Sequence, residues 1–428
     1  MLRYLTAGES HGKCLTAIME GVPARLDLAH DDIDRELSRR QIGYGRGGRM
    51  AIEKDEVEIT SGIRFGRTLG SPITMIIKNR DWENWKEIMN IEAMGNGQWA
   101  MGEEVTKPRP GHADLTGALK YGHYDIRNIL ERSSARETAA RVAVGAVCKR
   151  FLDEFGIKVM SWVVEIGGVR CKMGTVPDLR TERSGVVESG LSPKSIFELS
   201  ELSDVRCPDK KTAEKMRKAI DRARKNGNSI GGIFEVAVTG VPPGLGSHAQ
   251  WDRKLNGNLA RALMSIQAIK GVEVGMGFGV ASNPGSKVHD EIFYGSQKSE
   301  VRSQKDSELR TPNSELFWPV VPRFYRETNN AGGIEGGMSN GEPIILRAAM
   351  KPIPTLYKPL RSIDIKTKKP FQATVERSDI CAVPAASVIG EAVVAFEIAN
   401  VFIDKFGGDF VDEIKRNYRG YLEYLRKF

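Results

Sequence analysis

The clearest helical signal in the chain is residues 132–156, RSSARETAARVAVGAVCKRFLDEFG. Ser134 and Glu137 have the spacing of a capping box, in which a hydroxyl and a carboxylate satisfy the free amides at a helix start. A largely apolar run follows as far as Phe155, and Gly156 is a typical residue to end a helix. We therefore predict a helix that begins near Ser134 and ends before Gly156.

Two arginines, Arg132 and Arg136, flank the start of this helix. Free backbone amides at a helix start attract anions, and guanidinium groups match phosphate and carboxylate in shape. One interpretation is therefore an anion site at this end of the helix. The other is that Ser133 and Ser134 only cap the helix, and the spacing does not decide between the two.

Outside this helix, the predicted elements do not alternate in the regular way of a doubly wound sheet. Strands are predicted at 56–62, 71–78, 234–240 and 271–277. Helices are predicted at 31–40, 210–226, 251–270, 391–405 and 409–428. The order of these elements favours an α+β fold. We expect a single domain over residues 1–428, with a surface insertion near 296–322 and closing helices within 391–428.

The composition is that of a folded, ligand-binding protein: 40% of residues are hydrophobic, 28% are charged, and 45 are glycine. Glycine is enriched without a matching rise in proline or serine, which favours a loop-rich ligand site over disorder. The formal charge of +8 suits nucleic-acid binding. Aromatic residues make up only 7%, however, and many arginines lie in glycine-rich tracts. We therefore expect a small anionic ligand and no nucleic-acid partner.

The five cysteines are widely separated and odd in number, which is typical of reduced thiols in a cytoplasmic protein. No cysteine, histidine or acidic group has the spacing of a metal site, so we expect no metal. Residues 1–8 lack the pattern of a signal peptide. The chain has no eighteen uninterrupted apolar residues, and we expect no contact with a membrane.

Four glycine-rich tracts place histidine, arginine or asparagine beside glycine: GESHG at 8–12, GYGRGGR at 43–49, RPGHAD at 109–114 and NNAGGIEGGMSNG at 329–341. Glycine lets backbone amides approach a ligand more closely than any side chain permits. A tight turn is sufficient to explain any one tract. Their repetition favours anion recognition, and we expect a planar or phosphorylated ligand to meet the main chain at 329–341.

Two histidines and a set of arginines are the candidates for chemistry. His11 and His112 lie within glycine-rich tracts and are acid–base candidates, because imidazole titrates near neutral pH. The arginines that could gather around phosphate and carboxylate groups are Arg40, Arg46, Arg49, Arg109, Arg132 and Arg136. Asp379 lies close to Arg377 in the sequence, where a local ion pair is an equally good interpretation.

Six motifs, taken together and in this order, resemble the chorismate synthase family: GESHG at 8–12, GYGRGGRM at 43–50, RPGHAD at 109–114, RSSARET at 132–138, NNAGG at 329–333 and KPIPT at 351–355. The resemblance runs from near residue 1 to about residue 400. It implies a tetrameric β-α-β sandwich, a reduced FMN cofactor and the substrate 5-enolpyruvylshikimate 3-phosphate.

The family reaction is a 1,4-elimination of phosphate and a ring proton, which gives chorismate without net redox change. By resemblance, His11 protonates the departing phosphate, and His112 stabilises the negative charge of the flavin. Asp379 helps to remove the ring proton by way of the flavin, with Ser10 and Ser133 as relay hydroxyls.

The resemblance also implies the binding residues. Those for FMN are Arg132, Ser133, Ser134, Gln267, Ala268, Gly336, Lys351, Pro352, Ile353, Pro354, Thr355 and Arg377. Arg40 and Arg46 match positions assigned to NADP, although the same side chains could bind the substrate phosphate together with Arg49, Arg109 and Arg136. An alternative of another class is a protein that stores flavin or binds RNA without chemistry. Reduction of its own flavin by NADPH is a further alternative.

Two positions depart from the family pattern. Ser378 stands where many members have histidine, and Ala385 stands where many have arginine. Any role of those two side chains in the family therefore does not transfer to this chain.

Overall fold

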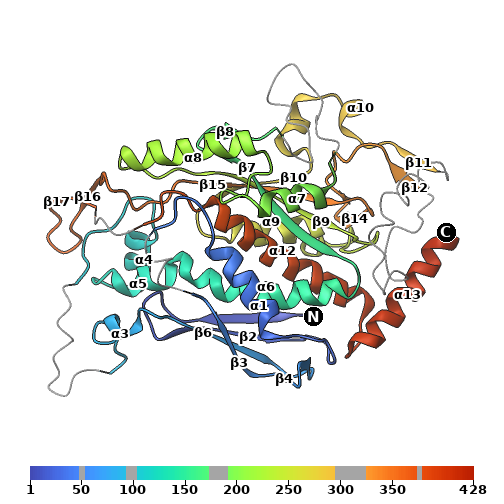
Figure 1. Ribbon diagram of the computed structural model, residues 1–428, viewed down its shortest axis with the longest axis horizontal. Coiled ribbons are helices and arrows are strands. Elements are labelled where there is room, and N and C mark those ends of the chain that lie inside the picture. The colour runs from blue at the N-terminus through green and yellow to red at the C-terminus, as the bar shows by residue number, and fades with distance from the viewer. Residues whose placement is uncertain (48–53, 93–103, 173–190, 295–323, 374–377) are drawn as a thin grey trace.

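The structure, a computed structural model, describes residues 1–47, 54–92, 104–172, 191–294, 324–373 and 378–428 (Figure 1). The predicted insertion near 296–322, Arg49 and Arg377 lie outside these described residues.

A four-stranded antiparallel sheet forms one outer layer of the molecule, in the order β1-β2-β6-β3. Its strands are β1 (Arg3–Ala7), β2 (Cys14–Glu20), β6 (Ile73–Lys78) and β3 (Val57–Ser61). Alternate residues such as Leu15, Ala17 and Met19 are buried, as expected for a sheet with one face on the core. A small hairpin of β4 (Ile63–Arg64) and β5 (Arg67–Thr68) follows β3.

A five-stranded antiparallel sheet forms the other layer, in the order β10-β15-β9-β7-β8. Its strands are β10 (Ile269–Val274), β15 (Ile344–Met350), β9 (Gly232–Thr239), β7 (Lys158–Ile166) and β8 (Val169–Arg170). The two-stranded pairs are β11 (Ile292–Tyr294) with β12 (Phe324–Arg326), β13 (Ile334–Glu335) with β14 (Met338–Ser339), and β16 (Arg361–Ile363) with β17 (Pro370–Gln372).

Three helices lie between the two sheets: α1 (His30–Gln41), α6 (Thr138–Asp153) and α12 (Val383–Phe406) (Figure 1). α6 packs on β2 and β6, α12 packs on β7 and β9, and the two helices pack on each other. They cross closely at Gly145, where an added Cβ would lie 2.3 Å from the Cβ of Ala392. This sheet–helix–sheet arrangement confirms the predicted α+β class and sandwich.

The remaining helices cover the outside and the ends of the sandwich. They are α3 (Trp82–Trp85), α4 (Asp114–Tyr121), α5 (Arg127–Ser133), α7 (Pro193–Glu201), α8 (Lys210–Lys225), α9 (Leu255–Met264), α10 (Gly285–Val288) and α13 (Val411–Lys427), with 3₁₀ turns at Ala135–Glu137, Trp251–Arg253 and Gly277–Ser282.

The helix predicted after Ser134 is confirmed, but its capping box forms only in part. The Ser134 hydroxyl accepts a hydrogen bond from the Arg136 amide, as predicted for a cap. The carboxylate of Glu137 instead binds Arg141 and Gln267. The glutamate is therefore used to hold another segment of the fold.

Two predicted boundaries are wrong. The helix predicted at 251–270 ends at Met264, and Ala268 adopts a left-handed conformation with φ of 68° before β10 begins at Ile269. The closing helix predicted from residue 391 begins at Val383, with Pro384 in its first turn, where a missing N–H costs little. Because α12 is buried on nearly all sides, its sequence lacks the amphipathic period that marks a helix start.

By length and composition, α12 would be able to cross a membrane, since its most apolar window has a mean hydropathy of 1.7. Within the fold, 83% of that window is buried. We therefore assign α12 as the core helix of the sandwich.

Candidate active site

Two of the predicted arginines lie together in the interior, between the end of α1 and the start of α6. Arg40 and Arg136 are 3% and 4% exposed. Both bind Asp55, with Arg136 Nη1 at 2.6 Å from Oδ1 and Arg40 Nη1 at 3.3 Å from Oδ2. Burial lowers the pKa of Arg40 to about 10, because the attraction of Asp55 only partly offsets the loss of water and the repulsion of Arg136. Two guanidinium groups thus share one carboxylate, an arrangement suited to binding an anion.

Asn79 connects this arginine pair to the loop at 8–12. Its Oδ1 accepts a hydrogen bond of 2.9 Å from Arg136 Nε, and its Nδ2 donates to the carbonyl oxygens of Glu9 and Gly12. Asn79 was not predicted from the sequence, where it follows β6 without any motif. Its contacts bring His11 and Arg136 into one structural unit.

His11 is held by a buried carboxylate. Its Nδ1 lies 2.9 Å from Glu131 Oε1, and its backbone amide donates to Oε2 at 2.8 Å. Burial opposes ionisation of Glu131, but hydrogen bonds from His11 and the nearby charge of Arg127 outweigh it and lower the pKa of this carboxyl. With Nδ1 turned to Glu131, Nε2 is the ring nitrogen through which a proton can pass to a ligand.

An aromatic ring lies against His11. The Trp85 ring from α3 stacks on the imidazole, with centroids 3.9 Å apart and planes inclined by 24°. The Arg127 guanidinium lies 5.2 Å from the Trp85 ring centre and 3.5 Å from Glu131 Oε1. Sequence reasoning missed all three of these partners, although Arg127 and Glu131 have the i,i+4 spacing of a helical ion pair.

Asp379 pairs with the second glycine-rich tract. Its Oδ2 lies 2.8 Å from Arg46 Nη1, and its Oδ1 accepts a hydrogen bond of 2.6 Å from the Gly47 amide. The neighbouring Ile380 amide donates to the Gly45 carbonyl at 2.8 Å. The two segments therefore run side by side, and the carboxylate of Asp379 is held from both its oxygens.

His112 belongs to a further group, built on Asp114 at the start of α4. Its Nδ1 hydrogen-bonds to Asp114 Oδ1, and Arg109 donates to Oδ2 from Nε and from its backbone amide, both at 2.9 Å. Burial opposes the charge on Asp114, but these hydrogen bonds outweigh it and hold the pKa of the carboxyl well below its usual range. Asp114 is therefore ionised and orients both side chains.

The KPIPT segment lies beside this group. Lys351 Nζ donates to the Gly111 carbonyl at 2.7 Å, and Arg109 Nη1 lies 3.3 Å from the Thr355 hydroxyl. The Lys351 amide donates to the carbonyl of Ala268 at 2.9 Å, so the segment also contacts the predicted pair of Gln267 and Ala268.

Gln267 carries the most informative polar atom of this region. Its Nε2 donates to Glu137 Oε1 at 2.7 Å. Its Oε1 is buried and, among the described residues, has no hydrogen-bond partner. Buried polar atoms are normally satisfied, so this oxygen is available to a donor on a ligand.

Three of the predicted FMN-binding residues, Arg132, Ser133 and Gly336, are held by contacts other than those described so far in this section. Arg132 donates to the carbonyl oxygens of Thr6 and Gly8, and the Ser133 hydroxyl donates to the Leu130 carbonyl. Gly336 lies in the β13–β14 turn, in the tract that contacts β10 at the end opposite to Ala268.

Backbone packing accounts for one glycine in this tract. An added Cβ at Gly332 would lie 2.4 Å from the Gly275 amide nitrogen. Close packing of the main chain is therefore enough to explain the glycine at position 332, and a bound ligand is not needed to explain it.

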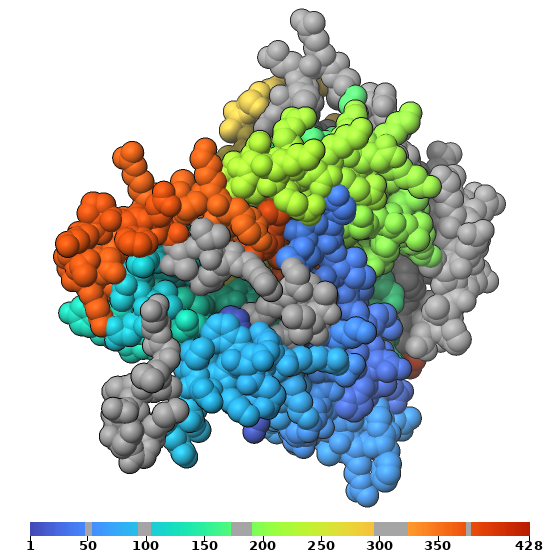
Figure 2. All heavy atoms as spheres, turned by 60° about the vertical axis from the view of Figure 1, so that its left-hand side comes forward, coloured from blue at the N-terminus to red at the C-terminus, as the bar shows by residue number. Residues whose placement is uncertain are grey.

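The segments that carry these groups meet on one face of the molecule. In the space-filling view, the end of α1, the region of α3 and the β16–β17 hairpin gather there, with α8 above them (Figure 2). A candidate proton donor, an arginine-rich interior and a carboxylate paired with a glycine-rich loop thus come from parts of the chain that are far apart in sequence.

Comparison with known proteins identifies the family. A family model described as chorismate synthase matches residues 2–403. Relatives named chorismate synthase include one from Pelobacter propionicus, 59% identical over 426 residues, and one from Geotalea uraniireducens, 55% identical over 428 residues. Each match covers 100% of this chain and 100% of the relative. A crystal structure of chorismate synthase is 43% identical with a TM-score of 0.74, covering 100% of this chain and 99% of that one. The chain therefore belongs to the chorismate synthase family, whose members are lyases that remove phosphate from 5-enolpyruvylshikimate 3-phosphate.

Proposed function

We propose that the groups described above carry out the family's reaction, the 1,4-elimination that converts 5-enolpyruvylshikimate 3-phosphate to chorismate. In this reaction a ring C–H bond and the C–O bond to phosphate break, and a new C=C bond forms. One observation carries the assignment: Asn79 joins the His11 loop to Arg136, so a proton donor and an excess of positive charge lie together. A departing phosphate needs both.

His11 is the proton donor to the phosphate. Glu131 holds Nδ1 and orients the ring, so we assign the transfer of the proton to Nε2. Arg40 and Arg136 bind the phosphate, since charge-assisted hydrogen bonds from guanidinium groups to phosphate are strong. Arg46, Arg49 and Arg109 are assigned to the remaining anionic groups of the substrate.

Asp379 is the group to which the ring proton finally passes. Arg46 and the Gly47 amide fix its two oxygens, which keeps its direction constant through the reaction. Ser10 is buried beside the backbone of Glu131, and Ser133 lies at the end of α5. We assign both hydroxyls as relays for protons.

Family membership implies a reduced flavin, and the described residues fit reduced FMN in two respects. The buried Gln267 Oε1 can accept a hydrogen bond from a heterocycle or a ribityl hydroxyl. Ala268 is left-handed and partly exposed, and its carbonyl oxygen accepts a hydrogen bond from the Lys351 amide, which places it beside the KPIPT segment. The residues that would hold it are Arg132, Ser133, Ser134, Gln267, Ala268, Lys351, Pro352, Ile353, Pro354, Thr355 and Arg377. When bound, reduced FMN would supply an electron-rich ring system. His112, which Asp114 holds, is the residue that we assign to stabilise its negative charge.

NADPH is a second candidate ligand for Arg40 and Arg46. Arg40 is 3% exposed and already bound to Asp55, so we assign it to the substrate phosphate. Reduction of FMN by NADPH is then a separate activity, which the assay below measures directly.

We also propose that residues 1–428 form one domain and assemble as a cytoplasmic homotetramer. The main hydrophobic core includes residues from Leu2 to Leu422, which supports one domain. All five cysteines are free, which suits a reducing compartment. The outer face of the first sheet exposes Leu5 and Ile18, apolar side chains that a subunit contact would cover. A neighbouring copy is also the means by which the distant Gly336 would contribute to a flavin site.

The test is an anaerobic assay with chemically reduced FMN, in which phosphate release and chorismate absorbance are followed together. The proposal predicts both signals in equal amounts, and their loss in His11→Ala and Asp379→Ala proteins that still bind flavin. Full activity in either variant would refute its assigned role. Repeating the assay with NADPH as the only reductant detects an intrinsic flavin reductase. RNA binding that weakens with salt, without any change in the flavin spectrum on adding substrate, would favour a binding protein instead.

A further inference from the structure

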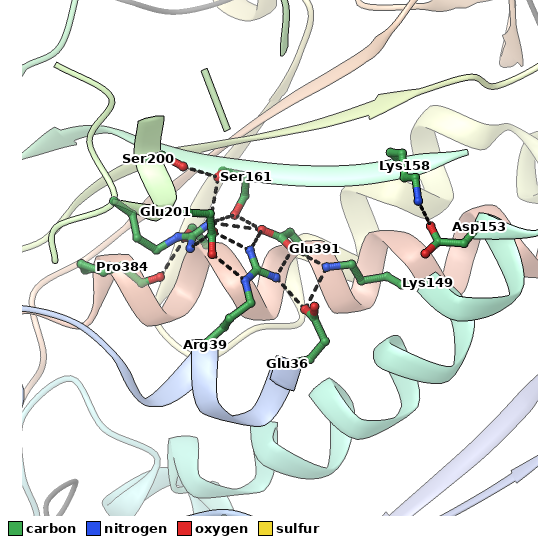
Figure 3. A network of polar contacts seen from close by, with 12 residues as sticks. Glu36, Arg39, Lys149, Asp153, Lys158, Ser161, Ser200, Glu201, Pro384 and Glu391 are labelled. Atoms are coloured by element: carbon green, nitrogen blue, oxygen red, sulfur yellow. Dashed lines mark hydrogen bonds and ion pairs between the residues drawn. The ribbon is translucent and has the colours of Figure 1, made fainter. Parts of the chain in front are cut away.

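Six charged side chains form a closed network in the layer of helices, centred on Glu391 of α12 (Figure 3). We call it the Glu391 network, and its members are Glu36, Arg39, Lys149, Glu201, Arg206 and Glu391. Three are cations and three are carboxylates, so their charges balance. Glu391 itself is 0% exposed.

Both oxygens of Glu391 are bound. Oε2 lies 2.7 Å from Arg39 Nη1 and 2.7 Å from Lys149 Nζ. Oε1 accepts hydrogen bonds from Arg39 Nη2 at 2.9 Å and from the Ser161 hydroxyl at 2.6 Å. Burial disfavours the charge, but the surrounding cations outweigh it and hold the pKa of Glu391 well below its usual range. Glu391 is therefore ionised within the fold, and cations and a hydroxyl hold both of its oxygens.

The network joins the two elements from which the Arg46–Asp379 pair is built. Arg39 lies in the last turn of α1, and Arg46 follows the end of that helix at Gln41. Glu391 lies on α12, and Asp379 precedes the start of that helix at Val383. A contact between Arg39 and Glu391 thus fixes the end of α1 relative to the first turns of α12, which carry Glu391 about two turns after the helix begins.

Arg206 and its turn provide a second connection between α12 and the glycine-rich tract that follows α1. Its Nε donates to the Ser387 hydroxyl of α12 at 2.8 Å, and its Nη2 lies 3.2 Å from Glu391 Oε1. In the same turn, the Asp204 carbonyl accepts a hydrogen bond of 2.8 Å from the Tyr44 amide in the glycine-rich tract. Arg206 has a φ of 53°, a conformation that is uncommon outside glycine and is maintained here by its bonds to α12.

We propose that Glu391 is a positioning residue, which acts through Arg39 and Arg206 to hold Arg46 and Gly47 against Asp379. This inference rests on the proposed role of Asp379 in removing the ring proton. Arg40 depends less on the network, because Asp55 and Thr138 hold its guanidinium directly. Loss of the network is therefore expected to disturb proton removal more than substrate binding.

The test is Glu391→Gln, which keeps the shape of the side chain and removes its charge. We expect kcat to fall about tenfold with KM nearly unchanged, since small displacements of a catalytic group are costly. With substrate deuterated at the ring carbon that loses its proton, the isotope effect on kcat is expected to rise above that of the wild type. A loss of folded protein alone lowers activity without changing an isotope effect.

The chain offers a matched control directly after the last residue of α6. Glu154 also binds two cations, Arg150 and Lys415, but it contacts neither α1 nor the start of α12 in these pairs. Glu154→Gln is expected to lower stability and to leave kcat and the isotope effect unchanged. The double variant Lys149→Met with Glu391→Gln restores the charge balance and is expected to recover most of the lost kcat.

A milder variant covers the case in which Glu391→Gln fails to fold. Ser387→Ala removes the acceptor of Arg206 Nε, together with the hydrogen bond that this hydroxyl donates to the Pro384 carbonyl within α12. We expect about a twofold to threefold fall in kcat with a raised isotope effect. A wild-type kcat and isotope effect in Glu391→Gln would overturn the inference, and the same result in Ser387→Ala would do so if only that variant folds. An equal change of kcat and isotope effect in Glu154→Gln would also overturn it. Absence of phosphate release by the wild type would instead refute the proposed function.

Discussion

Two groups of charges, each with a buried carboxylate at its centre, lie close to each other along α1, and they differ in charge balance. Around Arg39, three cations meet three carboxylates in the Glu391 network. Around the next residue, Arg40, two guanidinium groups share the carboxylate of Asp55. A balanced network is complete without a ligand, whereas a cluster with excess positive charge is stabilised by an anion. The comparison separates side chains that build the fold from those that serve the substrate.

The largest effect is expected from removing one arginine of each group. Arg136→Met leaves Asp55 paired with Arg40, so the protein should remain folded while turnover falls about a hundredfold or more, because charge-assisted hydrogen bonds to the substrate are lost. Arg206→Met leaves an excess carboxylate in a buried network and should cost about 3–5 kcal/mol of unfolding free energy. Urea unfolding and steady-state kinetics on both proteins check the contrast. Equal losses of stability in the two variants would remove the distinction.

Acid should lower the stability of the protein through the Glu391 carboxylate at the centre of the balanced network. Because the pKa of Glu391 is lower in the folded state, its stabilising contribution is present above the unfolded value near 4.3 and is lost as pH falls toward the folded value. Its share of the loss is at most about 1.4 kcal/mol per pH unit. Unfolding free energies between pH 7 and pH 3 should fall less steeply for Glu391→Gln than for the wild type. Identical slopes would mean that Glu391 contributes nothing to acid sensitivity.

The smallest effect is expected at Trp85, whose ring stacks on His11 and lies beside the Arg127 guanidinium. Trp85→Leu removes the ring that lies 3.9 Å from His11, while Glu131 continues to hold Nδ1. Aromatic stacking of this kind contributes about 0.5–1.5 kcal/mol, so kcat should fall roughly twofold to tenfold. Steady-state kinetics with saturating substrate give the answer, and Trp82→Leu on the same short helix is the control. A fall as large as that of His11→Ala would show that Trp85 does more than orient the ring.

Local signals in the sequence were sufficient for part of the fold. The helix after Ser134 was predicted because its cap, its apolar run and Gly156 agree, and the strands at 56–62 and 71–78 were predicted from β-branched runs. The start of α12 was missed because a helix buried on nearly all sides has no amphipathic period. The end of α9 was missed because only the tertiary structure explains the left-handed Ala268.

The candidate site was predicted unevenly for the same reason. His11, His112 and the arginines lie in glycine-rich motifs, which are visible in one sequence. Their partners Asp55 and Asn79 belong to no motif. Glu131 has only the i,i+4 spacing with Arg127, which does not indicate that it binds His11. Glu391 is visible in the sequence as a charged residue within an apolar run. Its three cationic partners cannot be predicted in the same way, because they come from other elements of the fold.

The central claim is that the excess charge around Arg40 and Arg136 binds the substrate phosphate. Calorimetric titration of 5-enolpyruvylshikimate 3-phosphate, without reduced flavin so that no turnover occurs, measures this binding at equilibrium. We predict a dissociation constant about a hundredfold larger for Arg136→Met than for the wild type. Arg206→Met should bind the substrate with nearly the wild-type dissociation constant at a temperature where this variant is folded. Wild-type affinity in Arg136→Met would contradict the account.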